Sequence, residues 1–191
     1  MEKTKEKITV KSLILCALFA ALIAVGAFIK IPIPPVPFTL QVFFIAMAGV
    51  LIGPRDATIA VGVYVLLGLI GVPVFTKPAG PGYIFEPTFG YILGFVLDAF
   101  VTGAIVKKRG DSSFITMIIA CLSGVGCSFL IGVPYFYMIM NLYLKNQMAI
   151  TTVLYSTFLL FIPADVVLMI LAAYIGKKVR PILKKSNLIN N

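Results

Sequence analysis

The feature that most constrains this chain is a series of apolar stretches about as long as a lipid bilayer is thick. Residues 12–30 and 112–133 carry almost no charge, and further apolar runs lie between and after them. A helix of about 20 apolar residues spans the hydrocarbon core of a membrane. Soluble domains have about a quarter charged residues, whereas this chain has 12%. The sequence therefore predicts an all-α, polytopic membrane protein.

Polar breaks divide the chain into six expected transmembrane helices within one membrane domain, residues 1–191. These helices are 12–30, 38–53, 57–73, 87–106, 112–133 and 157–176. The first follows a Lys-rich start that resembles a cleaved leader, but it is long for a leader and more spans follow it. We therefore expect this helix to be retained.

The positive charges predict the orientation. Six crossings put both termini on one side, and of the 16 Lys and Arg side chains only Lys30, Lys77 and Lys145 then fall on the other side. Because Lys and Arg concentrate on the cytoplasmic side of membrane proteins, both termini are expected in the cytoplasm. The net charge of +9 follows from this topology, and no basic stripe with stacking aromatics indicates nucleic-acid binding.

The connections on the outer side differ from the short inner ones. Residues 31–37 are rich in Pro, and residues 72–87 form a Pro- and Gly-rich loop with a lone acid, Glu86. Proline lacks an N–H group and restricts its neighbours, so neither segment is expected to be regular helix. Long structured loops on one face usually carry function.

Polar side chains from separate helices are expected at one depth near the outer side. Asp165 lies 12 residues before Lys177, about 18 Å along a helix. The other candidates at or above this depth are Thr39, Gln41, Glu86, Thr88 and Tyr91. Ionisable groups inside a membrane are costly and are functional candidates. Ligand contact is favoured for Asp165 and Gln41. For Glu86, helix capping and ligand contact are equally open. For the deeper Asp98, structural pairing or a subunit contact is as open as ligand contact.

The composition also limits the chemistry. There is no His, which removes His-based catalysis, and no P-loop motif, so the chain should not hydrolyse ATP itself. Cys16, Cys121 and Cys127 lie in apolar runs without metal-ligand spacing, and we expect neither a disulfide nor a metal site. No cofactor or catalytic residue is expected, although an intramembrane enzyme that uses Asp165, Glu86 or Asp98 remains an alternative.

Small residues follow one another at helical spacing in the first helix. Ala17 with Ala21, and Ala20 with Ala24, form two small-xxx-small pairs. This spacing lets two helices approach closely in lipid. These pairs could form a surface for a partner helix or pack inside the bundle, and both interpretations stay open.

Four motifs occur in the order in which a known family has them. They are "PVPFTLQVFF", "GLIGVPVF", "GPGYIFEPTFGYILGF" and "IPADVV". Together they resemble the BioY family, the biotin-specific S components of energy-coupling factor transporters, over about residues 12–180. The resemblance implies a subunit in the plasma membrane of a prokaryote that captures biotin from outside. It also implies a transmembrane coupling protein and two cytoplasmic ATPases as partners, with Ala17 and Ala21 on the docking face.

The chemistry of biotin suggests roles for the candidates. Asp165 would accept the ureido N–H groups, Gln41 or Thr39 would serve the carbonyl, and Phe38 and Tyr91 would lie against the rings. Candidates for the carboxylate are Lys77, Tyr143 and loop N–H groups near Gly82, while Glu86 and Thr88 stand at the start of the fourth helix. Leu168 occupies a position where family members often have Lys. An S component for another vitamin, such as thiamin or riboflavin, is the second hypothesis.

Overall fold

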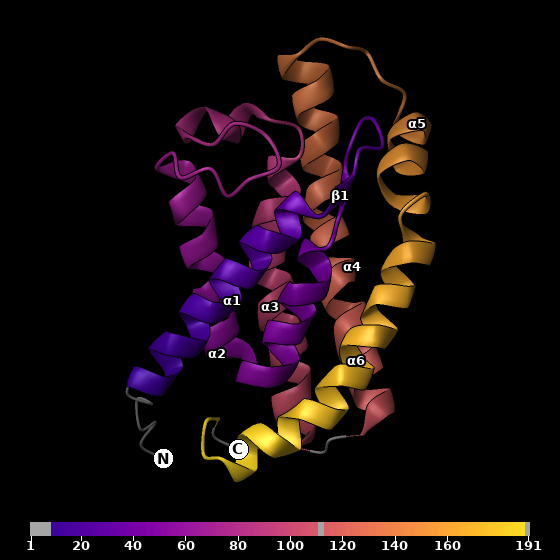
Figure 1. Ribbon diagram of the computed structural model, residues 1–191. Coiled ribbons are helices and arrows are strands. Elements are labelled where there is room, and N and C mark those ends of the chain that lie inside the picture. The colour runs from indigo at the N-terminus through magenta and orange to yellow at the C-terminus, as the bar shows by residue number, and fades with distance from the viewer. Residues whose placement is uncertain (1–8, 111–112, 190–191) are drawn as a thin grey trace, which may run out of the picture.

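The computed structural model describes residues 9–110 and 113–189, which form a helical bundle capped at one end by loops (Figure 1). In chain order the elements are α1 (Val10–Phe28), β1 (Lys30–Ile31), β2 (Phe38–Thr39), α2 (Gln41–Leu69), the 3₁₀ helix η1 (Pro81–Phe85), α3 (Phe89–Arg109), α4 (Phe114–Met138), the π-helical turn η2 (Ile139–Tyr143), α5 (Ile150–Leu154), the π-helical turn η3 (Tyr155–Leu159) and α6 (Ile162–Lys185). Two segments make the cap, and we name them the Pro-rich loop (residues 30–39) and the lid (residues 70–87). α1 begins and α6 ends at the opposite end of the bundle.

The helical membrane character predicted from the sequence is confirmed. Five helical stretches among the described residues are long and apolar enough to cross a membrane. They are Val10–Phe28, Gln41–Leu69, Phe89–Arg109, Phe114–Tyr143 and Ile150–Lys185. The described strands are β1 and β2, which have two residues each and pair antiparallel in the Pro-rich loop.

The long helix α2 reverses direction at Gly53. Gly53 has φ 82° and ψ 174°, outside the helical region, and Pro54 follows it without an N–H group to donate. Gln41 and Tyr64, on either side of this break, share a hydrogen bond of 2.6 Å. In a straight helix they would be about 34 Å apart, so the two halves of α2 run antiparallel. These halves correspond to the expected helices 38–53 and 57–73.

The expected ends of the later helices are wrong in two places. Helix 112–133 was expected to stop before Pro134, but α4 continues through Pro134 to Met138 and into η2. The continuing segment is apolar and aromatic, and it buries Phe136 against the bundle, which favours helix over a loop. Residue 112 itself lies outside the described residues.

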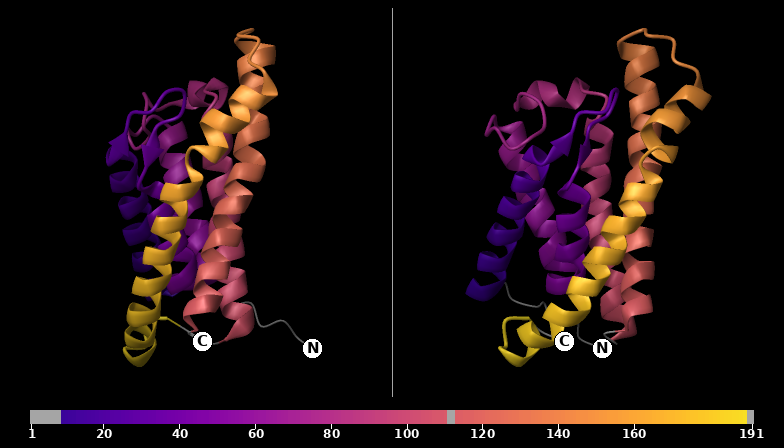
Figure 2. Two further views of the ribbon diagram at one scale, coloured as in Figure 1. Left: turned by 90° about the vertical axis from the view of Figure 1, so that its right-hand side faces the viewer. Right: turned by 45° about the vertical axis from the view of Figure 1, so that its right-hand side comes forward.

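The last helix is also longer than residues 157–176. Helical structure begins at Ile150 in α5, passes through η3, and runs to Lys185 at the end of α6. As a result, α4 and α5 rise above the lid as a hairpin (Figure 2). The other boundaries, for α1 and α3, agree with the expected helices 12–30 and 87–106 to within three residues.

Glycines bring α3 and α4 close together beside the cap. A Cβ atom at Gly94 would lie 2.7 Å from the Cα of Ser128, and one at Gly132 would lie 2.4 Å from the ring of Tyr91. Neither contact leaves room for a side chain, so the two helices approach as small residues allow in membrane proteins. This packing fixes Tyr91 and Ser128 on the walls of a cavity.

Candidate ligand-binding site

A cavity lies under the cap, between the Pro-rich loop, the lid and the upper parts of α2, α3, α4 and α6. Its volume is about 70 Å³. The lining residues are Val36, Pro37, Phe38, Thr39, Gln41, Val42, Tyr64, Thr76, Tyr83, Thr88, Tyr91, Ile92, Phe95, Val125, Ser128, Phe129, Thr157, Phe161 and Asp165. Pockets for small organic ligands are typically lined in this way, by apolar and aromatic side chains with a few placed polar groups.

Aromatic rings form the side walls of the cavity. Phe38 from the Pro-rich loop stacks on Phe161, with ring centroids 6.0 Å apart. Tyr91 from α3 meets Phe129 from α4 edge to face at 6.1 Å. The Tyr91 hydroxyl donates to the backbone carbonyl of Thr157 at 3.0 Å. This bond ties α3 to η3 and holds the ring against the cavity.

A chain of hydrogen bonds crosses one end of the cavity. The Thr39 hydroxyl donates to Gln41 Oε1 at 3.1 Å, and Gln41 Nε2 donates to the Tyr64 hydroxyl at 2.6 Å. The Gln41 amide therefore has partners, as a buried amide needs. This network also links the Pro-rich loop to both halves of α2.

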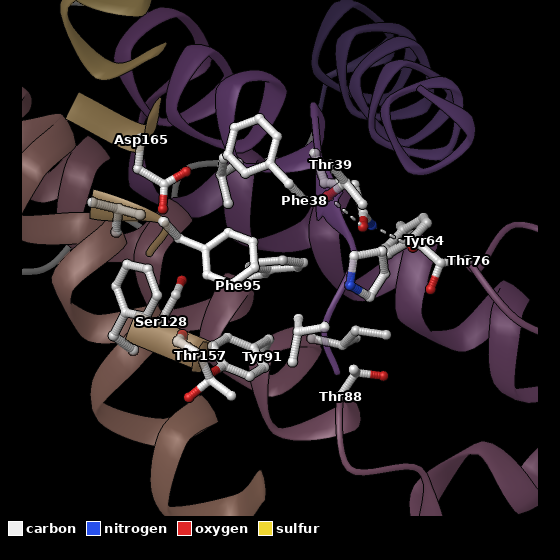
Figure 3. A pocket seen from close by; sticks show the side chains of 18 of the residues that line it. Phe38, Thr39, Tyr64, Thr76, Thr88, Tyr91, Phe95, Ser128, Thr157 and Asp165 are labelled. Atoms are coloured by element: carbon white, nitrogen blue, oxygen red, sulfur yellow. Dashed lines mark hydrogen bonds between the residues drawn. The ribbon is translucent and has the colours of Figure 1, made fainter. Parts of the chain in front are cut away.

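Asp165 lies at the other end of the cavity, opposite Tyr64 and Thr76 (Figure 3). The residue is 5% exposed. Within residues 9–110 and 113–189, no side chain donates a hydrogen bond to its carboxylate or forms an ion pair with it. A buried carboxylate in this state is a strong candidate for contact with a ligand that brings its own N–H or O–H donors.

Ser128 lies on the same side of the cavity as Asp165 (Figure 3), and a buried acid, Asp98, lies behind it. Its hydroxyl donates to Asp98 Oδ2 at 3.4 Å. Asp98 is 0% exposed and also receives a hydrogen bond of 3.0 Å from Thr102. Asp98 does not line the cavity, and its contacts with Thr102 and Ser128 are of the structural kind, one of the roles left open for it.

Thr88 is buried without a partner. Its Oγ1 is buried and has no hydrogen-bond partner among the described residues. The residue is 8% exposed and lines the cavity. It stands at the N-terminus of α3 but does not cap it.

Four of the predicted contact residues do not line the cavity. Lys77 and Glu86 form an ion pair of 2.6 Å with each other on the lid, with 44% and 34% of their side chains exposed. Gly82 lies in η1. Tyr143 is exposed and stacks on Phe85 with ring centroids 5.0 Å apart.

The sequence-based reasoning missed polar residues that do line the cavity. They are Tyr64, Thr76, Tyr83, Ser128 and Thr157. Tyr64 is a polar ring inside an apolar stretch, and Ser128 a hydroxyl in another, so both carried a sequence signal like that of Gln41. Their orientation depends on the helix rotation, which the sequence does not give.

The two alanine pairs of α1 separate in the structure. Ala17 and Ala21 are exposed on the outer face of α1. Ala20 is buried, and Ala24 is partly buried against the bundle. Internal packing therefore accounts for Ala20 and Ala24, whereas the outer face leaves the first pair free to meet another helix.

A second cavity lies at the end where α1 begins and α6 ends. It is larger, about 410 Å³, and several cations line it, among them Lys11, Arg55, Lys107 and Arg180. These belong to the cations that are expected on the cytoplasmic side from the sequence. Among the described residues, no three His, Cys, Asp or Glu side chains gather as metal ligands would.

The fold and the cavity under the cap define a class: helical membrane proteins that enclose a small, largely apolar molecule at one end of the bundle. Comparison with known proteins makes the assignment specific. The chain belongs to the BioY family, whose model matches residues 1–185. The resemblance drawn from the four motifs is therefore confirmed.

Relatives and a solved structure agree with this assignment. "Probable biotin transporter BioY" of Lysinibacillus sphaericus is 39% identical over 93% of this chain and 91% of its own length. "Biotin transporter BioY" of Thermotoga maritima is 37% identical over 89% and 96%. A crystal structure of the S-component for biotin from an ECF-type ABC transporter superposes with a TM-score of 0.72. It is 32% identical and covers 95% of both chains.

Proposed function

We propose that this chain is a substrate-binding S component of an energy-coupling factor importer that captures biotin outside the cell. The observation that carries the proposal is the structural match to an S-component for biotin, at 32% identity over 95% of both chains. The names of the relatives point to transport of the same vitamin. Because these relatives are transporters, the enzyme alternative is set aside.

The cavity supports a specific arrangement of biotin. The bicyclic ring is largely apolar and suits the aromatic walls of Phe38, Tyr91 and Phe95. The ureido N–H groups can donate hydrogen bonds to the carboxylate oxygens of Asp165. The Gln41 amide, which already orders two hydroxyl groups, lies at the opposite end of the cavity and would face the other polar end of biotin.

Equilibrium titration of the detergent-purified chain with biotin tests the proposal. Saturable binding without ATP is expected. Asp165→Ala and Gln41→Ala should each weaken it about tenfold or more, as loss of a hydrogen bond to a buried polar group would. Gln147→Ala, which removes an exposed amide, is the matched control. If the chain does not bind biotin at micromolar concentration but binds thiamin or riboflavin, it is an S component for that vitamin instead.

We also propose six membrane crossings, within a single membrane domain and with both termini in the cytoplasm. The two halves of α2 supply the second and third crossings, since α2 reverses at Gly53. α1 begins and α6 ends at one end of the bundle (Figure 1). The distribution of Lys and Arg supports the cytoplasm for this end.

The exposed face of α1 is the proposed contact with the transmembrane coupling protein. Ala17 and Ala21 lie on it with the larger side chains Leu18 and Val25 around them. Small residues four positions apart allow a second helix to approach closely. The two cytoplasmic ATPases would then supply the energy, since the chain has no P-loop.

A further inference from the structure

The second cavity, which we call the basal cavity, lies at the opposite end of the bundle from the cap. Its volume of about 410 Å³ falls within the ~300–1,000 Å³ typical of ligand pockets. It is lined by the start of α1, the reversal of α2, the last turn of α3, and α6 with the residues that follow it. An occupant would therefore contact four helices at once.

Close contacts between helices direct two cations into the basal cavity. A Cβ atom at Gly103 of α3 or at Gly176 of α6 would lie 2.5 Å from an atom of α2. Residues four positions apart share one face of a helix. Lys107 and Arg180 therefore follow one turn later on the faces that pack against α2, and both line the cavity. Arg180 is 6% exposed, so its charge is largely shielded from water.

The basal cavity has an excess of positive charge. Among the described residues that line it, the cations are Lys11, Arg55, Lys107 and Arg180, and the acid is Asp56. Asp56 accepts a hydrogen bond of 2.7 Å from the Ser12 hydroxyl. Arg55, Lys107 and Arg180 also take part in interactions within the protein, so the distinguishing feature is the excess of charge and not an unpaired cation. Like charges this close repel each other, and an anion between them would lower that repulsion.

The kinds of side chain around the cavity favour a phosphate group. Guanidinium groups match phosphate with two parallel hydrogen bonds, and Lys adds a point charge. Apolar side chains lie among the cations, namely Leu51, Leu188 and Ile189, and a free ion would gain nothing from them. Basic pockets between helices on the cytoplasmic side of membrane proteins bind phospholipid headgroups.

We infer that the basal cavity binds a phosphate-bearing anion, and that its apolar side chains favour the headgroup of an anionic phospholipid over free phosphate. This site is separate from the proposed capture of biotin and does not depend on it. The proposed orientation in the membrane places it at the inner leaflet.

Thermal unfolding of the delipidated full chain in a neutral detergent tests the site. Phosphatidylglycerol, phosphatidylcholine and inorganic phosphate are titrated separately at fixed ionic strength. Phosphatidylglycerol should raise the midpoint by about 5 °C at saturation, because a ligand that binds only the folded chain stabilises it. Phosphatidylcholine has no net charge and should have little effect. A shift with inorganic phosphate as large as that with phosphatidylglycerol would support the site and assign it to free phosphate.

Two double variants of equal net charge separate the cavity from the basic surface around it. Lys11→Gln with Lys107→Gln removes two cavity cations on exposed residues. This variant should need about tenfold more phosphatidylglycerol for the same shift, as loss of a hydrogen bond to a charged group would cause. Lys108→Gln with Lys185→Gln changes exposed residues outside the cavity and should respond like the wild type. Arg180 is kept, because replacement of a buried cation would also affect folding.

Three outcomes would overturn the inference. The first is a wild type that responds to neither phosphatidylglycerol nor phosphate. The second is an equal response in the two double variants, which would show general attraction to a basic surface. The third is a response that appears only in Glu2→Gln with Glu6→Gln, which would assign the cavity to acids of the chain itself that lie outside the described residues.

Discussion

Asp98 illustrates how a buried acid in a membrane protein can serve structure rather than ligand. Its carboxylate holds Thr102 of its own helix and Ser128 of α4. Thr102 lies 3.2 Å from the Ala120 carbonyl, so the cluster joins α3 to α4. Gly124 provides the space for it, because a Cβ atom there would lie 2.1 Å from both Asp98 Oδ1 and Thr102 Oγ1.

Gly124→Ala should therefore destabilise the chain, by about 1–3 kcal/mol as overpacking usually does. Gly126→Ala is the matched control on the same helix, since a Cβ atom at Gly126 has no neighbour within 4 Å. Thermal unfolding in detergent measures both. A midpoint for Gly124→Ala equal to that of Gly126→Ala would refute the packing role of the Asp98 cluster.

The ion pair between Lys77 and Glu86 should have a small effect on the rate at which biotin dissociates. Both side chains are substantially exposed, and such pairs contribute about 0–1 kcal/mol. Lys77→Ala and Glu86→Ala should each speed biotin dissociation by less than about fivefold, and the double variant no further. High salt should reproduce the effect in the wild type. A loss of biotin affinity for Lys77→Ala alone, beyond that for Glu86→Ala, would restore Lys77 as a ligand contact.

The lid is anchored by an aromatic ring inserted into α2. Phe75 is 3% exposed and packs edge to face on Tyr64, with ring centroids 5.4 Å apart. It fits because residue 68 is Gly, where a Cβ atom would lie 2.0 Å from the Phe75 ring.

The cavity of about 70 Å³ is smaller than the ~300 Å³ typical of ligand pockets. We therefore expect its loop walls to shift when biotin enters.

Gly68→Ala should displace Phe75 and loosen the lid. We expect biotin to dissociate several-fold faster, with the thermal midpoint lowered by a few degrees, as overpacking by a methyl group would cause. Gly62→Ala, on the same half of α2 and without a neighbour within 4 Å, should leave dissociation unchanged. Identical dissociation rates in the two variants would show that Phe75 does not control the lid.

Depth counting along the helices predicted much of the cavity lining. The lining residues predicted in this way, or from the resemblance, are Phe38, Thr39, Gln41, Thr88, Tyr91 and Asp165; their roles in binding stay predictions. Tyr143 was misplaced because α4 continues past Pro134 and carries it above the lid. Tyr64 was missed because its position opposite Gln41 follows from the reversal at Gly53, and the rotation of each half-helix is a property of packing.

The arrangement of the whole molecule in the membrane can be tested by labelling. With Cys16, Cys121 and Cys127 replaced by Ser, single cysteines are introduced at Lys145 and at Gly110. An impermeant thiol reagent added to intact cells should label the Lys145 position and not the Gly110 position. Labelling of both positions, or of Gly110 alone, would refute the proposed orientation.

The proposed docking face on α1 can be tested in the whole transporter. Ala17→Trp and Ala21→Trp should block biotin uptake in cells that have the coupling protein and ATPases, because a bulky ring keeps a second helix away. Biotin binding by the purified variants should stay unchanged. Ala20→Trp is the contrasting variant, since Ala20 is buried and its replacement should lower stability instead. Normal uptake by both outer-face variants would exclude this face.

Below the cavity the helices meet without space for a side chain. A Cβ atom would lie 2.7 Å from Thr102 at Gly49, 2.5 Å from Pro54 at Gly103, and 2.5 Å from Val50 at Gly176. Such contacts leave no room for a file of water at these three positions, and ions cross a membrane only with water or substitute ligands around them. Liposomes that contain the purified chain should therefore hold a proton gradient as long as empty ones, with or without biotin. We therefore expect that a cell can hold many copies of this protein without loss of its membrane potential.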